Sequence, residues 1–130
     1  MNAVIKTFKD DNGKLAVFLN GELDHHSAKT VRTEIDIAIS NKQPKELYLD
    51  FAGITFMDSS GIGLVMGRYK VMSEYGGKLY ITNAVGSIRR VMQVAGMTKL
   101  AKITDIDFAD ELFEQEKGSC ENEKVEENIK

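Results

Sequence analysis

"ELYLDF", residues 46–51, and "FMDSSGIG", residues 56–63, together predict a strand, a turn and the start of a helix. The first run is apolar on both faces, which is typical of a strand that lies between two layers. The second run places an aspartate, two serines and two glycines directly after hydrophobic residues, and aspartate and serine are residue types that cap helices. This strand-to-helix unit indicates an α/β fold.

The rest of the chain continues the alternation of strands and helices. The runs "AVIKTF" and "LAVFLN" flank Asn12-Gly13, a pair that favours a tight turn, so an antiparallel hairpin is predicted at the start. Apolar spacing predicts a helix that begins at Ser27 and a second helix after the DSSG turn. Further strands are predicted over 77–82 and 99–104, and further helices over 87–95, closed by Gly96, and over 108–116. This order predicts a sheet covered by helices.

The length and composition suit one domain. With 130 residues, of which 42% are hydrophobic, the chain can bury a substantial core, and we expect residues 1–116 to form it. Residues 117–130 are acidic with few large apolar side chains, so we expect a disordered tail. The net charge of −3 is accounted for by six Glu and three Lys in residues 114–130. The neutral remainder argues against a nucleic-acid partner.

The sequence also indicates a cytoplasmic protein. No apolar run approaches the roughly 18 residues needed to span a bilayer, and the first residues lack the apolar core of a signal peptide. The single cysteine, Cys120, cannot form an internal disulfide. His25 and His26 are adjacent and would point apart on an extended chain, so they form a poor metal pair. We expect no membrane partner, metal site or cofactor.

Ser59 and Ser60 lie at the junction between a predicted strand and a predicted helix. Open sheets commonly present functional groups at the carboxyl ends of their strands. One interpretation is structural, because Asp58 and both serines can satisfy the free N–H groups of a first helical turn. The other is a site for an anion or for phosphorylation, since a helix N-terminus stabilises negative charge. The residue pattern leaves both interpretations open. Asp24 and Ser27 can cap the first helix in the same way.

The helix after the DSSG turn has two apolar sides. The stripe predicted to face the sheet contains Ile62, Val65, Met66, Tyr69 and Met72. The opposite side contains Ser60, Leu64, Gly67 and Val71, flanked by Arg68 and Tyr75. A docking surface is the interpretation we favour for this second side, and scattered exposed residues are the ordinary alternative. When the periodicity of this helix is extended back to the serines, it predicts that Ser60 points outward and that Ser59 lies at the edge of the stripe that faces the sheet.

Two other protein classes use residues of these types. A serine hydrolase could combine Ser59 or Ser60 with a histidine, but "MDSSG" lacks the first glycine of G-x-S-x-G. A receiver domain would accept phosphate on an aspartate at a strand end, such as Asp50 or Asp58. Acid stability of the phosphorylated product distinguishes the second class from a phosphoserine protein.

"FMDSSGIGLVMGRYK" together with "GELDHHSA", residues 21–28, resembles the STAS-domain anti-sigma factor antagonists. The resemblance covers residues 1 to about 113, and "ELDHH" and "GRYK" point to the sporulation branch, the antagonists of the anti-sigma F factor. It implies an α/β fold in which a mixed sheet carries helices mainly on one side. Family members are substrates of a kinase and not enzymes.

The resemblance further implies a regulatory switch. Unphosphorylated protein binds an anti-sigma factor that is also a serine kinase, with its bound ADP or ATP, and so releases the sporulation sigma factor. Phosphorylation of the serine after the aspartate, Ser59 here, switches binding off until a serine phosphatase reverses it. A STAS switch of another pathway, such as the general stress response, is the alternative. The candidate partner-binding residues are Glu22, Leu23, Asp24, Asp58, Ser60, Gly61, Leu64, Gly67, Arg68 and Val71.

Overall fold

A computed structural model describes residues 4–9 and 13–106 of the chain, with side chains from residue 13 onward. Within these residues five strands form one sheet, namely β1 (Val4–Lys9), β2 (Lys14–Leu23), β3 (Glu46–Met57), β4 (Lys78–Thr82) and β5 (Lys102–Thr104). The order of the strands in the sheet is their order in the chain. β1 and β2 are antiparallel, and the other three neighbouring pairs are parallel. The predicted mixed sheet is confirmed.

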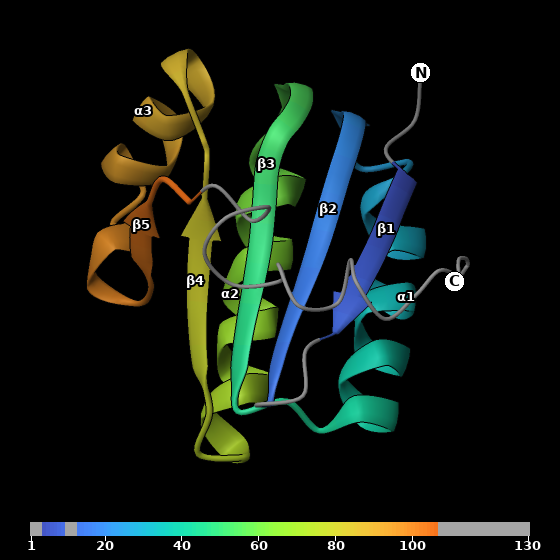
Figure 1. Ribbon diagram of the computed structural model, residues 1–130. Helices are drawn as coiled ribbons and strands as arrows, with labels where there is room; N and C mark the ends of the chain where they lie inside the picture. Colours follow the sequence, from blue (N-terminus) through green and yellow to red (C-terminus); the bar gives the residue numbers. More distant parts are fainter. Residues whose placement is uncertain (1–3, 10–12, 107–130) are drawn as a thin grey trace.

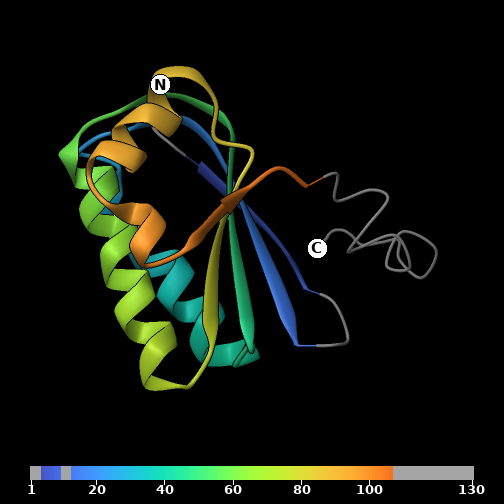
Figure 2. The ribbon, with the colours of Figure 1, turned by 90° about the vertical axis from the view of Figure 1, so that its left-hand side faces the viewer.

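Three helices connect the parallel strands: α1 (Ala28–Lys42), α2 (Ser59–Glu74) and α3 (Gly86–Val94), the last followed by the short turn Met97–Lys99. Crossovers between parallel strands nearly always have one hand. A sheet that grows in one direction therefore receives all its crossover helices on the same face. Figures 1 and 2 show this arrangement, with α1, α2 and α3 on one side of the sheet.

The main core lies between the helices and the sheet. The inward residues of β2, β3 and β4 meet those of the helices, and fully buried side chains there include Leu19, Phe51, Ile81, Ile35 and Met72. Alternation along the strands sends the intervening residues to the face without helices. That second face has its own small apolar cluster around Ala16 and Tyr48.

Most predicted elements are found. The antiparallel hairpin, the helix that begins after Ser27 and the helix that follows the DSSG turn are confirmed. Gly96 follows α3 with φ of 83°, the left-handed conformation that glycine adopts readily at a helix end. Asn12 of the predicted Asn12-Gly13 turn, the helix over 108–116 and the tail over 117–130 lie outside the described residues.

β3 is longer than predicted, because it continues past Phe51 to Met57. The extension pairs with the second half of β2, after shifts in register between Phe18 and Asn20 and between Gly21 and Glu22. Gly53 permits this approach, since a Cβ there would lie 1.9 Å from Oδ1 of Asn20. The extension carries the carboxyl end of β3, and with it the DSSG turn, to the upper edge of the sheet in Figure 1.

Candidate functional site

The loops after β2 and β3 lie side by side at this edge. Leu23 pairs with Met57 in the parallel register, and the amide of Asp58 donates a hydrogen bond to the carbonyl of Leu23 at 3.3 Å. The segment "GELDHHSA" therefore lies beside the DSSG turn. The candidate residues Glu22, Leu23 and Asp24 belong to this edge, although Leu23 itself is buried.

Asp58 caps α2. Its backbone is extended, and its Oδ1 accepts a hydrogen bond from the amide of Ser60 at 2.8 Å. The amide of Gly61 donates to the Asp58 carbonyl at 3.0 Å, which completes the first turn. The Asp58 side chain therefore caps the N-terminus of α2, and neither serine side chain takes part in this capping.

Ser59 is the first residue of α2 and is exposed, whereas Ser60 is half-buried. Among the described residues, the Ser59 side chain has no hydrogen-bond partner. The phase argument that pointed Ser60 outward and placed Ser59 beside the core is wrong. A free hydroxyl at a helix N-terminus is open to a modifying enzyme, and the helix dipole favours negative charge there.

Gly61 brings α2 close to the ends of β2 and β3. A Cβ at this position would lie 2.3 Å from Cγ of Met57 and 3.2 Å from Cδ2 of Leu23. Any larger residue has to displace Met57 or the helix. Gly61 is buried, so its part in the candidate site is to position the turn and not to contact a partner directly.

The outward face of α2 differs from the prediction. Leu64 is 4% exposed and Arg68 is 5% exposed, so their assignment to the exposed face is wrong. The reason is that α1 packs beside α2 and covers this side of the helix (Figure 1). The exposed residues of α2 are Ser59, Gly63, Met66, Lys70, Ser73 and Glu74, and Gly67 and Val71 are half-buried at the margin. Of the residues predicted to face the sheet, Ile62 and Tyr69 are only partly buried, and Met66 is 41% exposed.

Arg68 forms an ion pair with Asp36 of α1. Its Nε lies 3.0 Å from Oδ1 of Asp36, but the two atoms are not aligned for a hydrogen bond, and Nη1 of Arg68 has no hydrogen-bond partner within residues 13–106. Burial lowers the pKa of the Arg68 guanidinium from its ordinary value, while the Asp36 carboxylate acts in the opposite direction. This contact joins the helix that carries Ser59 to its neighbour.

The turn before α1 is organised by Asp24 and Ser27. Oδ1 of Asp24 accepts hydrogen bonds from the amides of His26 at 2.9 Å and Ser27 at 3.1 Å. The Ser27 hydroxyl donates to the Glu22 carbonyl at 2.9 Å. The bond from the Ser27 amide is the main reason that the pKa of the Asp24 carboxyl lies below its ordinary value. Both residues thus shape the turn, although the Ser27 hydroxyl does not cap the helix in the predicted way.

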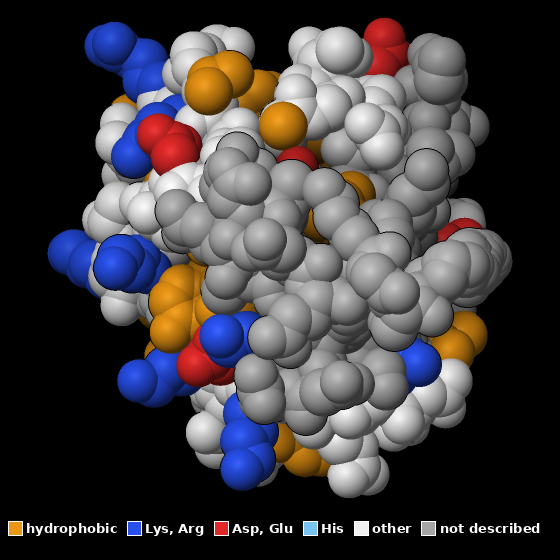
Figure 3. Space-filling model, viewed as in Figure 1, with side chains coloured by type: hydrophobic (Ala, Val, Ile, Leu, Met, Phe, Trp, Pro, Cys, Tyr) orange, Lys and Arg blue, Asp and Glu red, His pale blue; other side chains and the backbone are white. Residues whose placement is uncertain are grey.

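The edge also presents apolar residues that the sequence interpretation missed. Phe56, 49% exposed, precedes the DSSG turn, and Val85, 65% exposed, follows β4 at the same edge of the sheet. Figure 3 shows hydrophobic side chains along this upper edge of the molecule. Alternation along β3 could have found Phe56 only if the strand had been predicted to continue to Met57. An exposed aromatic residue three positions before a free hydroxyl, as Phe56 is before Ser59, is suited to protein contact.

The two aspartates considered as phosphate acceptors are both engaged. Asp58 caps α2, and Asp50 is 5% exposed with Oδ1 accepting from Thr82 Oγ1 at 2.9 Å. Neither carboxylate is presented freely, in contrast to the Ser59 hydroxyl. The rings of His25 and His26 are tilted by 38° with centroids 4.0 Å apart, and the described residues contain no group of three His, Cys, Asp or Glu able to hold a metal ion. None of the helices within residues 13–106 is both long and apolar enough to cross a bilayer.

Comparison with known proteins identifies the family to which this fold belongs. A model of the STAS domain matches residues 4–110. An anti-sigma F factor antagonist of Paenibacillus polymyxa is 38% identical over 93 residues, which cover 72% of this chain and 80% of that protein. The structure of the anti-sigma factor antagonist SpoIIAA in its unphosphorylated form matches with a TM-score of 0.72 and 27% identity, over 92% of this chain and 100% of that one.

A structure of the Bacillus cell fate determinant SpoIIAA in its phosphorylated form matches with a TM-score of 0.66 and 26% identity, over 90% of this chain and 100% of that one. The chain belongs to the STAS-domain family of anti-sigma factor antagonists. The resemblance inferred from "FMDSSGIGLVMGRYK" and "GELDHHSA" is confirmed.

Proposed function

We propose that this protein binds an anti-sigma F factor that is also a serine kinase, and that phosphorylation of Ser59 ends the binding. The observation that carries the proposal is the exposure of the Ser59 hydroxyl at the start of α2, beside an aspartate already committed to capping. The relative at 38% identity is an anti-sigma F factor antagonist, and a SpoIIAA of similar fold has been solved in its phosphorylated form. Both support the sporulation pathway for this chain.

The proposed docking surface is built around Ser59. It combines the exposed face of α2 with the adjoining ends of β2 and β3, and its central residues are Glu22, Asp24, Phe56, Gly63 and Met66. Asp58, Ser60, Gly67 and Val71 lie within or at the margin of this surface. Leu23, Gly61, Leu64 and Arg68 support it from beneath.

Phosphorylation would change the charge of this surface. A phosphate adds about −1.5 to −2 charges and three acceptor oxygens. Glu22, Asp24 and Asp58 already make this edge acidic, so the phosphate adds to negative charge that has to be desolvated against a partner. A penalty of about 3 kcal/mol would lower affinity roughly a hundredfold. The dipole of α2 offsets part of the added charge within the protein, so the fold accommodates the modification.

In the proposed cycle the protein is a substrate and a binding partner, and not a catalyst. The unphosphorylated form captures the anti-sigma factor with its bound nucleotide in the cytoplasm, which frees the sigma factor. The kinase then phosphorylates Ser59 and releases the product, and a serine phosphatase restores the active form. The protein itself needs no cofactor for this cycle.

Intact-mass spectrometry after incubation with an anti-sigma F kinase and Mg-ATP tests the proposal, with Ser59→Ala and Ser60→Ala as matched variants. We expect one phosphate on the parent and on Ser60→Ala, and none on Ser59→Ala. Phosphate on Ser59→Ala, or none on the parent with a kinase active on another antagonist, would overturn the assignment. The product should also survive acid treatment, which an acyl phosphate on an aspartate does not.

A STAS switch of another pathway, such as the general stress response, is the second candidate function. The same surface would serve it, because the exposed serine and the capping aspartate do not depend on which kinase is used. Parallel phosphorylation and binding assays with an anti-sigma B kinase distinguish the two. Faster modification and tighter binding with the anti-sigma B protein would favour this second function.

A further inference from the structure

The methionines in the described part of the chain differ in exposure. Met57 is 8% exposed, and Met72, Met92 and Met97 are fully buried in the main core, whereas Met66 of α2 is 41% exposed. Of these five side chains, Met66 is the one that a small solute in water reaches while the protein stays folded. A reagent that reacts with methionine sulfur should therefore modify Met66 first.

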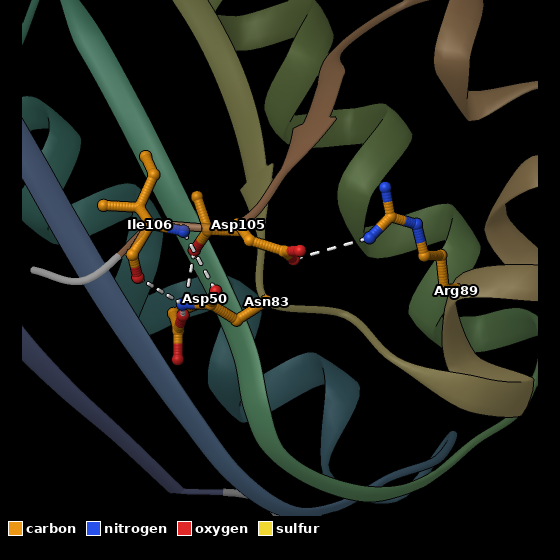
Figure 4. A network of polar contacts seen from close by, with 6 residues as sticks. Asp50, Asn83, Arg89, Asp105 and Ile106 are labelled. Atoms are coloured by element: carbon orange, nitrogen blue, oxygen red, sulfur yellow. Dashed lines mark hydrogen bonds and ion pairs between the residues drawn. The ribbon is translucent and has the colours of Figure 1, made fainter.

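Polar contacts at the end of the sheet help to keep two of the buried methionines covered. These two methionines belong to α3 and to the short turn after it. Arg89 of α3 pairs with Asp105, just after β5, at 3.4 Å. Asn83, just after β4, donates to the carbonyl of Ile106 at 2.9 Å and accepts from its amide at 3.0 Å. These contacts, shown in Figure 4, tie α3 and the end of β5 to the sheet.

Met66 lies on the same face of α2 as Ser59, and both residues are exposed. The two are seven positions apart, which is close to two helical turns and about 10.5 Å along the helix axis. Gly63, nearly one turn before Met66, and Gly67, directly after it, have open space where a Cβ would lie. Met66 is therefore a large apolar side chain on an otherwise flat part of the proposed docking surface. A partner that covers this face of α2 also covers Met66.

Hydrogen peroxide oxidises an exposed thioether of this kind to a sulfoxide. A lone pair of the sulfur attacks one peroxide oxygen and the O–O bond breaks. The attacked oxygen stays on the sulfur and gives up its proton, with which the second oxygen leaves as water. The sulfur loses two electrons, and the peroxide gains them. The sulfoxide is polar and accepts hydrogen bonds, so in an interface that excludes water it leaves an acceptor without a partner.

We propose that Met66 is a site of reversible oxidation by peroxide, and that its sulfoxide weakens capture of the anti-sigma factor without any phosphate on Ser59. The inference rests on the proposed function, because it takes the exposed face of α2 as the interface. The added oxygen carries no net charge, so it acts through the loss of an apolar contact, whereas a phosphate acts through charge. Methionine sulfoxide reductases return the sulfur to the thioether, which makes the oxidised state reversible.

Treatment of the folded full chain with hydrogen peroxide, followed by digestion and tandem mass spectrometry, tests the site. We expect one added oxygen on Met66 before any appears on the four buried methionines. The same treatment in concentrated urea should make the five rates similar, because unfolding exposes all of these side chains. Oxidation of Met57 or Met72 in the folded protein as fast as that of Met66 would overturn the assignment, and so would a preference for Met66 that persists in urea.

Calorimetric titration with an anti-sigma F factor, in ADP so that no phosphate is transferred, tests the consequence. The matched variant is Met66→Leu, which keeps an apolar side chain of similar volume without the sulfur. Each chain is compared with itself before and after peroxide, and both chains contain Met1 and Cys120, so oxidation of these residues affects both alike. We expect peroxide to lower the affinity of the parent about tenfold, and that of Met66→Leu not at all.

Treatment of the oxidised parent with a methionine sulfoxide reductase should restore its affinity. Equal losses in the parent and in Met66→Leu would overturn the inference, because the effect would then arise at another residue. Capture by the parent that is unchanged when Met66 is fully oxidised would overturn the inference and leave the proposed function intact. Failure of the unoxidised parent to bind at all would overturn the proposed function, and the inference with it.

Discussion

Gly61 lies directly against Met57, so that a Cβ on the glycine would come within 2.3 Å of the methionine Cγ. This contact sets how closely the N-terminus of α2 approaches the ends of β2 and β3. The position of Ser59, two residues earlier, follows from it. The packing beneath the turn therefore determines how the hydroxyl is presented.

Gly61→Ala is expected to destabilise the protein by about 1–3 kcal/mol, the usual cost of overpacking a core. The added methyl group has to displace Met57 or shift the first turn of α2. Urea unfolding measures the loss, and the rate of Ser59 phosphorylation should fall with it. Gly61→Ala with parental stability and an unchanged phosphorylation rate would show that the contact can relax without consequence.

Gly63→Ala and Gly67→Ala should act in the opposite direction on stability. A Cβ at either position meets nothing within 4 Å, and alanine favours a helix over glycine by about 0.5–1 kcal/mol. Each variant should unfold at a higher urea concentration than the parent. On the proposed docking surface, however, the same methyl groups would hinder close approach and weaken capture of the anti-sigma factor by about tenfold.

Ser73→Ala is the control for this pair, since Ser73 is exposed in the last turn of α2, far along the helix from Ser59. It should leave affinity unchanged. Gly63→Ala and Gly67→Ala proteins that are stabilised and still bind as tightly as the parent would exclude the outer face of α2 from the interface.

The ion pair between Arg68 and Asp36 predicts an unequal response to removal of its two partners. Asp36→Ala leaves a buried guanidinium without its counter-charge, and we expect a loss of about 1–2 kcal/mol, less than for a fully buried pair because Asp36 is partly exposed. Arg68→Met keeps a long apolar side chain and leaves an aspartate that water can solvate, so its cost should be smaller. The urea unfolding midpoints of the two variants test this expectation. A larger loss of stability for Arg68→Met than for Asp36→Ala would contradict it.

The lowered pKa of Asp24 predicts a pH dependence of stability. A carboxyl whose folded-state pKa lies below its ordinary value of 3.8 contributes stability above that value, and the contribution is lost as the pH falls through the lower folded-state pKa. A carbon-detected NMR titration should therefore place the Asp24 midpoint below 3.8. Asp24→Asn should be less stable than the parent near neutral pH and should converge with it in strong acid. A midpoint at or above the ordinary value would refute the role of the Ser27 amide.

The order of the elements could be predicted because local signals decide it. Asn12-Gly13 marks the hairpin, Gly96 ends α3 and the DSSG turn starts α2. The family could be recognised for the same reason, since the residues that carry the resemblance are two short contiguous stretches. The capping role of Asp58 also follows from its position alone.

The orientation of α2 could not be predicted from its own sequence. Its buried side depends on α1, which packs beside it and supplies Asp36 as the partner of Arg68. A helical wheel treats an arginine as exposed, and only the neighbouring helix makes its burial possible. The error in phase also misplaced Ser59, which the structure leaves exposed at the first position of the helix.

Because the strands pair in the order in which they occur in the chain, each parallel pairing is separated by only one helix and its loops. Contact order is correspondingly low for a protein with a largely parallel sheet, and low contact order goes with fast folding. Chains are also synthesised from the N-terminus, and domains fold as units as they emerge. The hairpin and β3 can thus pair, with α1 in place, before the residues that follow Ile106 have left the ribosome.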